Sequence, residues 1–373
     1  QHFTGSYQKI FYEVNKLYNT NNNYFSNSLL HWYDSNSRDL PWRKTNDLYK
    51  IWISEVMLQQ TRVDTVVPYY LRWVEKYKTI KSVAKADNLK LLKLWEGLGY
   101  YSRCRNFHKA CKIIINDYDG EIPSDYQQFR LLPGVGDYTA SAVFSIGHKQ
   151  TYAAIDGNVR RVMARVLRIK NITNHNKKRI NNTLIKWMDR ERPGDINQAL
   201  MDLANKICRV SHAQCSTCPI DEICMANKMS IPESYPTRVK KKIIPHKEIV
   251  AGIIWRKDKF LITKRKENEL LGGLWELPGG EILSSETPIG ALRRQIKEEW
   301  DIEINIKKKV GYVKHAYSHF KITLTLYQCQ TQESVKIMNK EYRWITPSEI
   351  QYFPFPKSNH KLFNLLNSNG WNV

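Results

Sequence analysis

The stretch Leu131-Leu132-Pro133-Gly134-Val135-Gly136-Asp137-Tyr138-Thr139-Ala140 predicts a tight hairpin that leads into a helix. Gly134 and Gly136 allow backbone N–H groups to approach an anion closely. The next helix begins at Asp137, and its N-terminus directs a partial positive charge toward the same anion. A lone Gly-Val-Gly is usually an ordinary turn, but the whole string indicates a helix–hairpin–helix, a clamp for a DNA phosphate group.

Four cysteines with the spacing C-x6-C-x2-C-x5-C follow this hairpin about seventy residues later: Cys208, Cys215, Cys218 and Cys224. Clustered thiolates form a soft ligand set that suits zinc or an iron–sulfur cluster. A disulfide scaffold is not expected, because the chain is long enough to fold around an apolar core and no secretory pattern is visible. The spacing alone leaves both the zinc knuckle and the iron–sulfur cluster open.

The composition predicts a globular, basic protein of two domains. The chain has 373 residues, 42% of them hydrophobic and 12% aromatic, with a formal net charge of +22. An excess of Lys and Arg favours a polyanionic partner, although a general Lys/Asn/Ile bias in composition also contributes. No apolar run is long enough to span a membrane. Cys104, Cys111 and Cys329 are read as ordinary reduced thiols, so we expect a cytoplasmic, nucleoid-associated protein of the bacterial type.

The periodicity of apolar residues changes along the chain. It is helical from about Tyr24 to Cys224, which predicts a first domain over 25–229. Prolines and a basic run mark a linker over 230–247. Alternating strands and helices follow, so residues 248–373 are expected to form an α/β or α+β domain. Residues 1–24 are an extension to which we assign no function. The expected strands are Ile249–Trp255, Phe260–Lys264, Val310–Lys314 and Lys321–Cys329, and the expected helices are Ile289–Trp300 and one after Ser358.

Asp47–Gln60 predicts a capped helix with a carboxyl group on its buried face. Asp47 can cap the helix, and Glu55 falls three or four residues from the apolar side chains at positions 51, 52 and 58. Burial disfavours the charged form and raises the pKa, as a general acid working near neutral pH requires. A core Glu paired with an Arg elsewhere in the sequence is an equally good interpretation of this segment alone.

A second carboxyl group lies in Ile155–Arg161, twenty residues after the hairpin. Asp156 stands where a helix begins, and by itself such a residue is most simply an N-cap.

Taken together, these segments resemble the adenine DNA glycosylase (MutY) family of helix–hairpin–helix glycosylases. Ser54-Glu55-Val56-Met57-Leu58-Gln59-Gln60-Thr61 is similar to the catalytic-helix motif of that family, and the resemblance covers roughly residues 25–370. It implies an all-α first domain in which the four cysteines hold a 4Fe–4S cluster. It implies that Glu55 protonates adenine, and that Asp156 stabilises the oxocarbenium-like sugar cation. Tyr138 and Asn158 are expected to hydrogen-bond in the same site.

The same resemblance implies the contacts with DNA and the type of reaction. Tyr138 stands where bifunctional relatives carry a Schiff-base lysine, which implies base excision without strong strand cleavage. Tyr100 lies in a loop with a glycine on either side of Leu98, and it matches the residue that wedges into the base stack. The alternative interpretation is that Tyr100 is a buried aromatic residue at the start of a helix. The other expected DNA contacts are Gln60, Thr61, Gly134, Gly136 and Arg43, the last of which could simply be solvated.

The C-terminal part resembles a Nudix domain that has lost its hydrolase site. Leu277-Pro278-Gly279-Gly280, Glu286, Arg294, Glu298 and Glu299 resemble the Nudix box, but Gln295 replaces an expected Glu and Asp301 an expected Gly. A neutral amide is a poor ligand for Mg²⁺. The family uses such a domain to recognise 8-oxoguanine through a Phe-Ser-His hairpin, which Tyr317, Ser318 and His319 match here.

The sequence therefore predicts a multidomain, monofunctional adenine DNA glycosylase that acts as a monomer in base excision repair. The expected substrate is double-stranded DNA with A:8-oxoguanine or A:G mispairs, and no membrane partner is expected. Three alternatives remain: a mismatch thymine glycosylase, which would lack the C-terminal domain and Glu55 in this setting; a nucleotide pyrophosphatase fused to a DNA-binding module; and a non-catalytic iron–sulfur DNA-binding protein.

Overall fold

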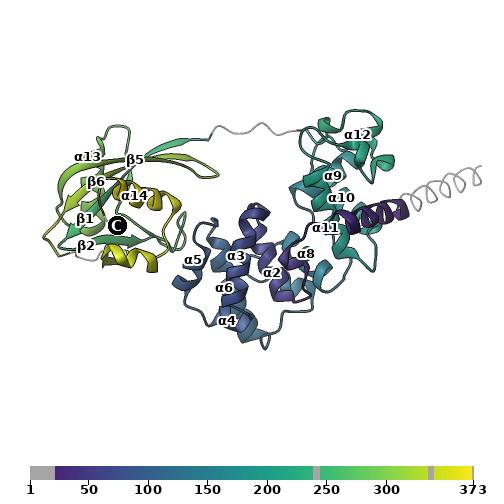
Figure 1. Ribbon diagram of the computed structural model, residues 1–373, viewed down its shortest axis with the longest axis horizontal. Coiled ribbons are helices and arrows are strands. Elements are labelled where there is room, and N and C mark those ends of the chain that lie inside the picture. The colour runs from purple at the N-terminus through teal and green to yellow at the C-terminus, as the bar shows by residue number, and fades with distance from the viewer. Residues whose placement is uncertain (1–21, 238–243, 335–339, 372–373) are drawn as a thin grey trace, which may run out of the picture. The chain divides into compact units, whose positions relative to one another are not determined.

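A computed structural model describes residues 22–237, 244–334 and 340–371 (Figure 1). The chain divides into two compact units, Gln1–Lys81 with Ala110–Lys240, and Ser82–Lys109 with Lys241–Val373. The sequence predicts one domain boundary, in the linker 230–247. The second unit also takes in residues 82–109 from the helical half. The expected extension 1–24 lies largely outside the described residues, as does the middle of the predicted linker.

The first half of the chain is helical, as its apolar periodicity predicts. A first helix covers residues 22–36, and short 3-10 turns surround the cysteines. The other elements are η1 (Pro41–Arg43), α2 (Leu48–Leu58), α3 (Val63–Lys76), α4 (Ile80–Ala84), α5 (Asn88–Trp95), α6 (Ser102–Asp117), α7 (Tyr126–Arg130), α8 (Asp137–Gly147), α9 (Gly157–Val166), α10 (Asn174–Trp187), α11 (Pro193–Lys206), η2 (Cys215–Thr217), η3 (Asp221–Ile223), α12 (Met225–Lys228) and η4 (Pro232–Ser234).

Acidic caps and apolar packing fix the helices that carry the site. The Asp47 carboxylate accepts the N–H groups of Tyr49 and Lys50 at the start of α2, as predicted. Helix α8 packs against α2 and α11, and α11 packs against α9. Gly194 of α11 permits the contact with α8, since a Cβ there would lie 2.7 Å from the Cα of Ile146. The N-termini of α8 and α9 are thereby held on one rigid core.

The C-terminal part is a mixed sheet of seven strands in the path β3-β2-β1-β6-β5, with β4 beside β1 and β7 beside β2. Strands β1 and β6 run parallel, and the other pairs are antiparallel. The four predicted strands and both helices are present; β3, β4 and β7 are short and were not predicted. The elements are β1 (His246–Arg256), β2 (Lys259–Lys264), β3 (Trp275–Glu276), β4 (Gly279–Glu281), α13 (Pro288–Trp300), β5 (Asn305–Ala316), β6 (Lys321–Gln330), β7 (Tyr342–Ile345), η5 (Pro347–Tyr352) and α14 (Lys357–Ser368).

Alternation along β1 builds an apolar core on each face of this sheet. Ala251 and Ile253 join the core that includes α14, and Val250 and Ile254 join the core that includes α13. Successive side chains of a strand point to opposite faces, so this run of buried residues serves both cores. Within the described parts of the chain, no helix is both long and apolar enough to cross a membrane.

Candidate active site

Glu55 lies on the buried face of α2, as the sequence predicts. The residue is 4% exposed, and its Oε2 has no hydrogen-bond partner among the described residues. Burial raises the pKa of its carboxyl group to about 7; a hydrogen bond with Tyr138 and the charge of Arg43 lower it, and the charge of Asp156 raises it. The structure therefore brings together a carboxyl group that is half protonated near neutral pH and three predicted site residues.

Tyr138 lies in the first turn of α8, directly after the hairpin. Gly136 is the N-cap of this helix and Gly134 has a φ of 80°, a left-handed conformation that glycine adopts at little cost. The Tyr138 hydroxyl contacts Sδ of Met201 at 3.7 Å. Burial raises its pKa well above the ordinary value, and the neighbouring Glu55 and Asp156 add to this effect. Tyr138 is therefore a neutral hydrogen-bonding group.

Asp156 is the N-cap of α9, and both of its oxygens are occupied. Oδ1 accepts the backbone N–H groups of Asn158 at 2.8 Å and Val159 at 2.7 Å, and Oδ2 accepts the side-chain amide of Asn158 at 2.9 Å. Oδ1 of Asn158 in turn accepts from Arg161, which also donates to the carbonyl oxygens of Cys208 and Ala204. A continuous set of hydrogen bonds thus joins the Asp156 carboxylate to the cysteine loop.

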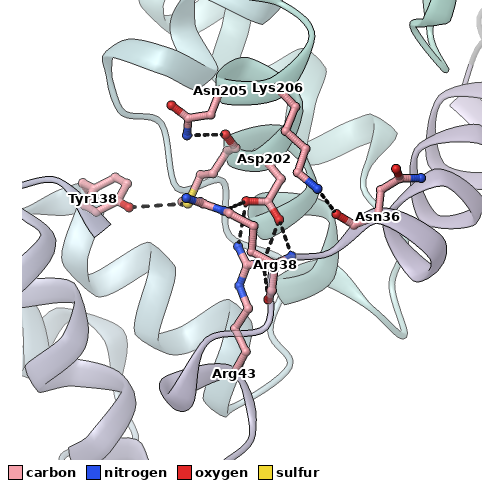
Figure 2. A network of polar contacts seen from close by, with 8 residues as sticks. Asn36, Arg38, Arg43, Tyr138, Asp202, Asn205 and Lys206 are labelled. Carbon is pink, nitrogen blue, oxygen red and sulfur yellow. Dashed lines mark hydrogen bonds and ion pairs between the residues drawn. The ribbon is translucent and has the colours of Figure 1, made fainter. Parts of the chain in front are cut away.

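A buried ion-pair network lies beside Tyr138 (Figure 2). Asp202 of α11 has a fully buried side chain; it accepts from Arg38 at 2.6 Å and, through both oxygens, from Arg43 at 2.7 and 3.2 Å. The Arg43 guanidinium lies over the Tyr33 ring and is 10% exposed. The contact of Arg43 with DNA stays a prediction; among the described residues its guanidinium pairs with Asp202. Arg43 supplies a fixed positive charge near Glu55.

The residues expected at DNA in the first unit lie at turns. Gln60 is exposed with a φ of 57°, just beyond the end of α2, and Thr61 follows it half-buried. Gly134 and Gly136 are exposed, and no side chain caps the N-terminus of α8. The neighbouring Gln59 is turned inward and donates to the Thr139 hydroxyl at 3.1 Å.

In the second unit, the loop before α6 meets the turn between β5 and β6. The hydroxyl groups of Tyr100 and Ser318 are 2.5 Å apart. Ser318 and His319 are exposed, whereas Tyr317 is half-buried and hydrogen-bonds Ser358 at 2.9 Å. Both segments line one open pocket. The hairpin thus presents two of its three predicted residues and turns the aromatic one toward the core.

The four predicted cysteine ligands line one small pocket with an empty volume of about 370 Å³. Burial raises the pKa of Cys218 to about 12, and it also raises the pKa values of Cys215 and Cys224. Arg165, almost fully buried, donates to the Cys208 sulfur at 3.2 Å. Among the described residues, no group of three or more His, Cys, Asp or Glu side chains is placed to hold a single metal ion.

The residues of the Nudix-like box are paired with cations. Arg294 bonds Glu286 at 2.5 Å and Glu298 at 3.2 Å, and Lys340 bonds Glu299 at 2.5 Å. Gln295 packs against Gly280, where a Cβ would lie 2.5 Å from its amide. Asp301 adopts the left-handed conformation with a φ of 49° at the position where the family motif has glycine.

Sequence reasoning missed Asp202, Arg161 and Arg165. In the sequence each is only a charged residue in an amphipathic helix. The tertiary contacts show that Asp202 and Arg165 are buried and that Arg161 is half-buried and bonded to two carbonyl groups. Arg161 lies within the Ile155–Arg161 segment, so its spacing from Asn158 could have suggested an i, i+3 pair.

Comparisons with known proteins agree with this arrangement. Residues 53–190 match the model of the HhH-GPD superfamily of base excision DNA repair proteins, and residues 250–365 match a NUDIX domain. The chain is 34% identical over 402 residues to the adenine DNA glycosylase of Schizosaccharomyces pombe, with 88% of this chain and 86% of that protein covered. It is 30% identical to the adenine DNA glycosylase of Homo sapiens, with 91% and 73% covered.

Among solved structures, a thermostable thymine-DNA glycosylase superposes with a TM-score of 0.53 at 27% identity, over 57% of this chain and 98% of that one. This likeness supports the fold of the helical part. The curated relatives extend over most of both chains and share one activity. The chain belongs to the adenine DNA glycosylase family: it is a DNA N-glycosylase of base excision repair with a helix–hairpin–helix region and a Nudix-like C-terminal domain.

Proposed function

We propose that this protein is a monofunctional glycosylase that removes adenine from A:8-oxoguanine and A:G mispairs in double-stranded DNA, and that it acts as a monomer. One observation carries the proposal: Glu55 is a buried carboxyl group with a pKa of about 7 and an oxygen without a partner among the described residues. It therefore holds a proton near neutral pH and can present it to a substrate. We keep the domain boundaries 25–229 and 248–373 as predictions.

In this proposal Glu55 donates its proton to a ring nitrogen of adenine, which turns the base into a neutral leaving group. Tyr138, itself protonated, hydrogen-bonds the same carboxyl group and orients it. Protonation of the leaving group weakens the N-glycosidic bond because the departing electron pair is neutralised as it forms. The base must first leave the stack, since its ring nitrogens are inaccessible inside the duplex.

As the bond breaks, positive charge develops on the sugar. A water molecule from solvent then adds to the anomeric carbon and releases a proton to solvent, from which Glu55 is reprotonated. Asp156 supports the proposed stabilising role through its fixed carboxylate, which three hydrogen bonds hold at the start of α9. A carboxylate beside an oxocarbenium-like cation lowers its free energy electrostatically, as in glycoside hydrolysis. Asn158 is proposed to position this carboxylate. Tyr138 has no amine for a Schiff base, which supports base release without strand cleavage.

DNA binding is assigned to the exposed turns. The uncapped N-terminus of α8, with Gly134 and Gly136 before it, can accept a backbone phosphate. Gln60 and Thr61 follow α2 and are proposed to lie at the base stack near the flipped adenine. The net charge of +22 supports binding to a polyanion.

Recognition of 8-oxoguanine is assigned to the hairpin between β5 and β6. Ser318 and His319 are exposed there and offer a hydroxyl and an imidazole, which can hydrogen-bond the added oxygen and N–H group of the oxidised base. Tyr100 lies beside Ser318 and is proposed to wedge into the stack next to the base being read. Tyr317, which is half-buried, is proposed to brace the turn against the core.

The cysteine pocket is proposed to hold a 4Fe–4S cluster through Cys208, Cys215, Cys218 and Cys224. The four thiols line one apolar space, and such a soft ligand set suits an iron–sulfur cluster, which the resemblance to the family favours over zinc. When bound, the cluster would fix the loop 208–224 as a structural unit. Arg161 and Arg165 hold the same loop through its backbone carbonyl groups.

The deciding experiment is single-turnover base release from labelled duplexes with one central pair: A·8-oxoguanine, A·G or T·G. Adenine release with strand breaks only after alkali supports the proposal, with the faster rate on A·8-oxoguanine. Thymine release with inert adenine would assign the protein to the mismatch thymine enzymes. Strand cleavage before alkali would overturn the monofunctional part alone. Equal rates on A·8-oxoguanine and A·G would remove the recognition role of the hairpin.

A further inference from the structure

Glu96 joins the end of α5 to the segment between η5 and α14, both in the second unit. Its Oε1 accepts the backbone N–H of Phe355 at 2.6 Å and lies 2.7 Å from Nε2 of His360. Its Oε2 pairs with Lys93 at 2.7 Å. The carboxylate side chain is only 15% exposed. Each oxygen thus has a charged or backbone partner, in a partly desolvated place where such bonds are strong.

The neighbouring side chains of the same segment make further contacts with the Nudix-like domain. Lys93 donates to the carbonyl oxygen of Phe353 at 2.9 Å, and Arg105 donates to those of Gly272 and Glu267. Gly273 permits this approach, since a Cβ there would lie 3.3 Å from Leu92. The helix before the Tyr100 loop and the helix after it are therefore both fixed to this domain.

The loop between these anchors is short and carries the proposed wedge. Glu96 is followed at once by Gly97, and Tyr100 stands four residues on with a left-handed φ of 49°. A loop that contains two glycines has many conformations of its own, and fixing both ends removes most of them. In the structure this loop places the Tyr100 hydroxyl 2.5 Å from that of Ser318.

We propose that Glu96 is a positioning residue that fixes the Tyr100 loop against the Ser318–His319 hairpin. Tyr100, which wedges into the base stack, and the hairpin, which recognises 8-oxoguanine, then approach the mispair as one rigid unit. This inference rests on the proposed function of the hairpin. Burial raises the pKa of Glu96, but hydrogen bonds from His360, Lys93 and the Phe355 amide outweigh it and leave the pKa below its ordinary value. The carboxylate is therefore charged at neutral pH and forms an ion pair with Lys93.

The test uses the full chain with Glu96→Ala, Glu96→Gln and the control Lys109→Ala. Lys109 also reaches the Nudix-like domain from this segment, but its 3.5 Å pair with Glu267 is about 60% exposed on both sides. Hydrogen exchange at 97–102 and 353–356 measures the anchoring directly. Single-turnover adenine release from A·8-oxoguanine and A·G measures the preference between the two mispairs.

We expect Glu96→Ala to exchange faster in both segments and to lower the A·8-oxoguanine preference about tenfold, since a displacement of about 1 Å can cost up to a hundredfold in rate. Glu96→Gln keeps an acceptor for the Phe355 amide and should fall between Glu96→Ala and wild type. Lys109→Ala should match wild type in both measurements.

Unchanged exchange at 97–102 in Glu96→Ala would overturn the proposal, as would equal rate losses on the two mispairs, which a role in folding alone would give. A wild-type protein without preference for A·8-oxoguanine would overturn the recognition function instead. In that case the exchange measurement still decides whether Glu96 fixes the loop.

Discussion

Asp156 and Asn158 form a closed pair in which the Asn158 side-chain amide donates to Oδ2 of Asp156 at 2.9 Å while its backbone N–H donates to Oδ1 at 2.8 Å. The carboxylate therefore caps α9 and is held in one orientation. The same geometry serves a structural role and the proposed catalytic role, so the two must be separated by substitution.

Replacing Asp156 with Asn should separate them. Asn is as good an N-cap as Asp, but its amide group would face the side-chain amide donor of Asn158, so the free energy of unfolding should fall by about 1–2 kcal/mol. The negative charge beside the developing sugar cation is lost, and base release should fall by at least about a hundredfold. Chemical denaturation and single-turnover kinetics on the same preparation measure the two effects.

Asp156→Ala is the matched control, because it removes both the cap and the charge and should cost a further 1 kcal/mol or so of stability. Near-normal base release by the Asn variant would leave Asp156 with the capping role alone.

The pKa of Glu55 predicts a pH dependence of both activity and stability. Burial raises this pKa to about 7, so base release should decline as the pH rises above 7 and the acid loses its proton. A pKa raised in the folded state means that the protein loses stability as the pH rises from about 4.5 to about 7. Since one pH unit corresponds to about 1.4 kcal/mol, the loss is about 3 kcal/mol.

Glu55→Gln does not titrate and should be inactive while still binding the mispair. Its stability relative to wild type should rise between pH 4.5 and about 7.5 and then level off, as measured by denaturation at fixed pH values. A wild-type rate that is flat from pH 6 to pH 9 would exclude Glu55 as the acid.

How far the sequence predicted this site depends on whether a role is local. Asp47 and Asp156 were predictable because an N-cap needs only its own helix, and Glu55 because the 3.6-residue period places it on the buried face. The partner of Arg43 could not be predicted, because Asp202 lies 159 residues away in the sequence. No local pattern in Pro41–Arg43 distinguishes a solvated arginine from a buried one.

The Arg43–Asp202 pair predicts a large, coupled effect of substitution. Asp202→Asn leaves two guanidinium groups with no compensating charge in a buried place, and we expect a loss of about 3–5 kcal/mol in the free energy of unfolding. Arg43→Ala also removes a charge that lowers the pKa of Glu55, so the pH at which base release declines should move upward.

Lys44→Ala is the control, because the Lys44–Asp39 pair is 66% and 76% exposed and should contribute less than about 1 kcal/mol. An unchanged pH profile in Arg43→Ala would show that Arg43 does not act on Glu55.

The exposed side chains of the β5–β6 turn should control the preference for 8-oxoguanine. Replacing Ser318 and His319 with Ala should lower the rate on A·8-oxoguanine by about tenfold or more and leave A·G release much less affected, since each removed hydrogen bond is worth about 1 kcal/mol. Tyr312→Ala, at an exposed position on the same hairpin, is the control. Equal losses on both mispairs would remove this role.

The division of the chain shows a second limit of the sequence. Residues 82–109 have the helical periodicity of the first half, yet they belong to the second unit. Their anchors to that unit are polar contacts, such as those of Glu96 and Arg105, together with Leu89, which packs against the core that includes α14. Hydrophobic periodicity predicts which face of a helix is buried, but it does not say which domain buries it.

In the Nudix-like domain, Gln295, Glu299 and Lys340 line one pocket. We expect that restoring the missing carboxylate at position 295 is insufficient for metal binding there. The Lys340 ammonium lies 2.5 Å from Glu299 and is 18% exposed, so it supplies the positive charge that Mg²⁺ would bring. Gln295→Glu alone should therefore bind no Mn²⁺, used as a spectroscopic substitute for Mg²⁺, at millimolar concentration. Gln295→Glu combined with Lys340→Ala should bind it, because Glu299 and the new carboxylate at position 295 then share the pocket without the Lys340 charge. Paramagnetic resonance of free Mn²⁺ measures both. Binding of Mn²⁺ by the single variant would show that Gln295 alone prevents metal binding. No binding by the double variant would show that residues elsewhere in the domain prevent it.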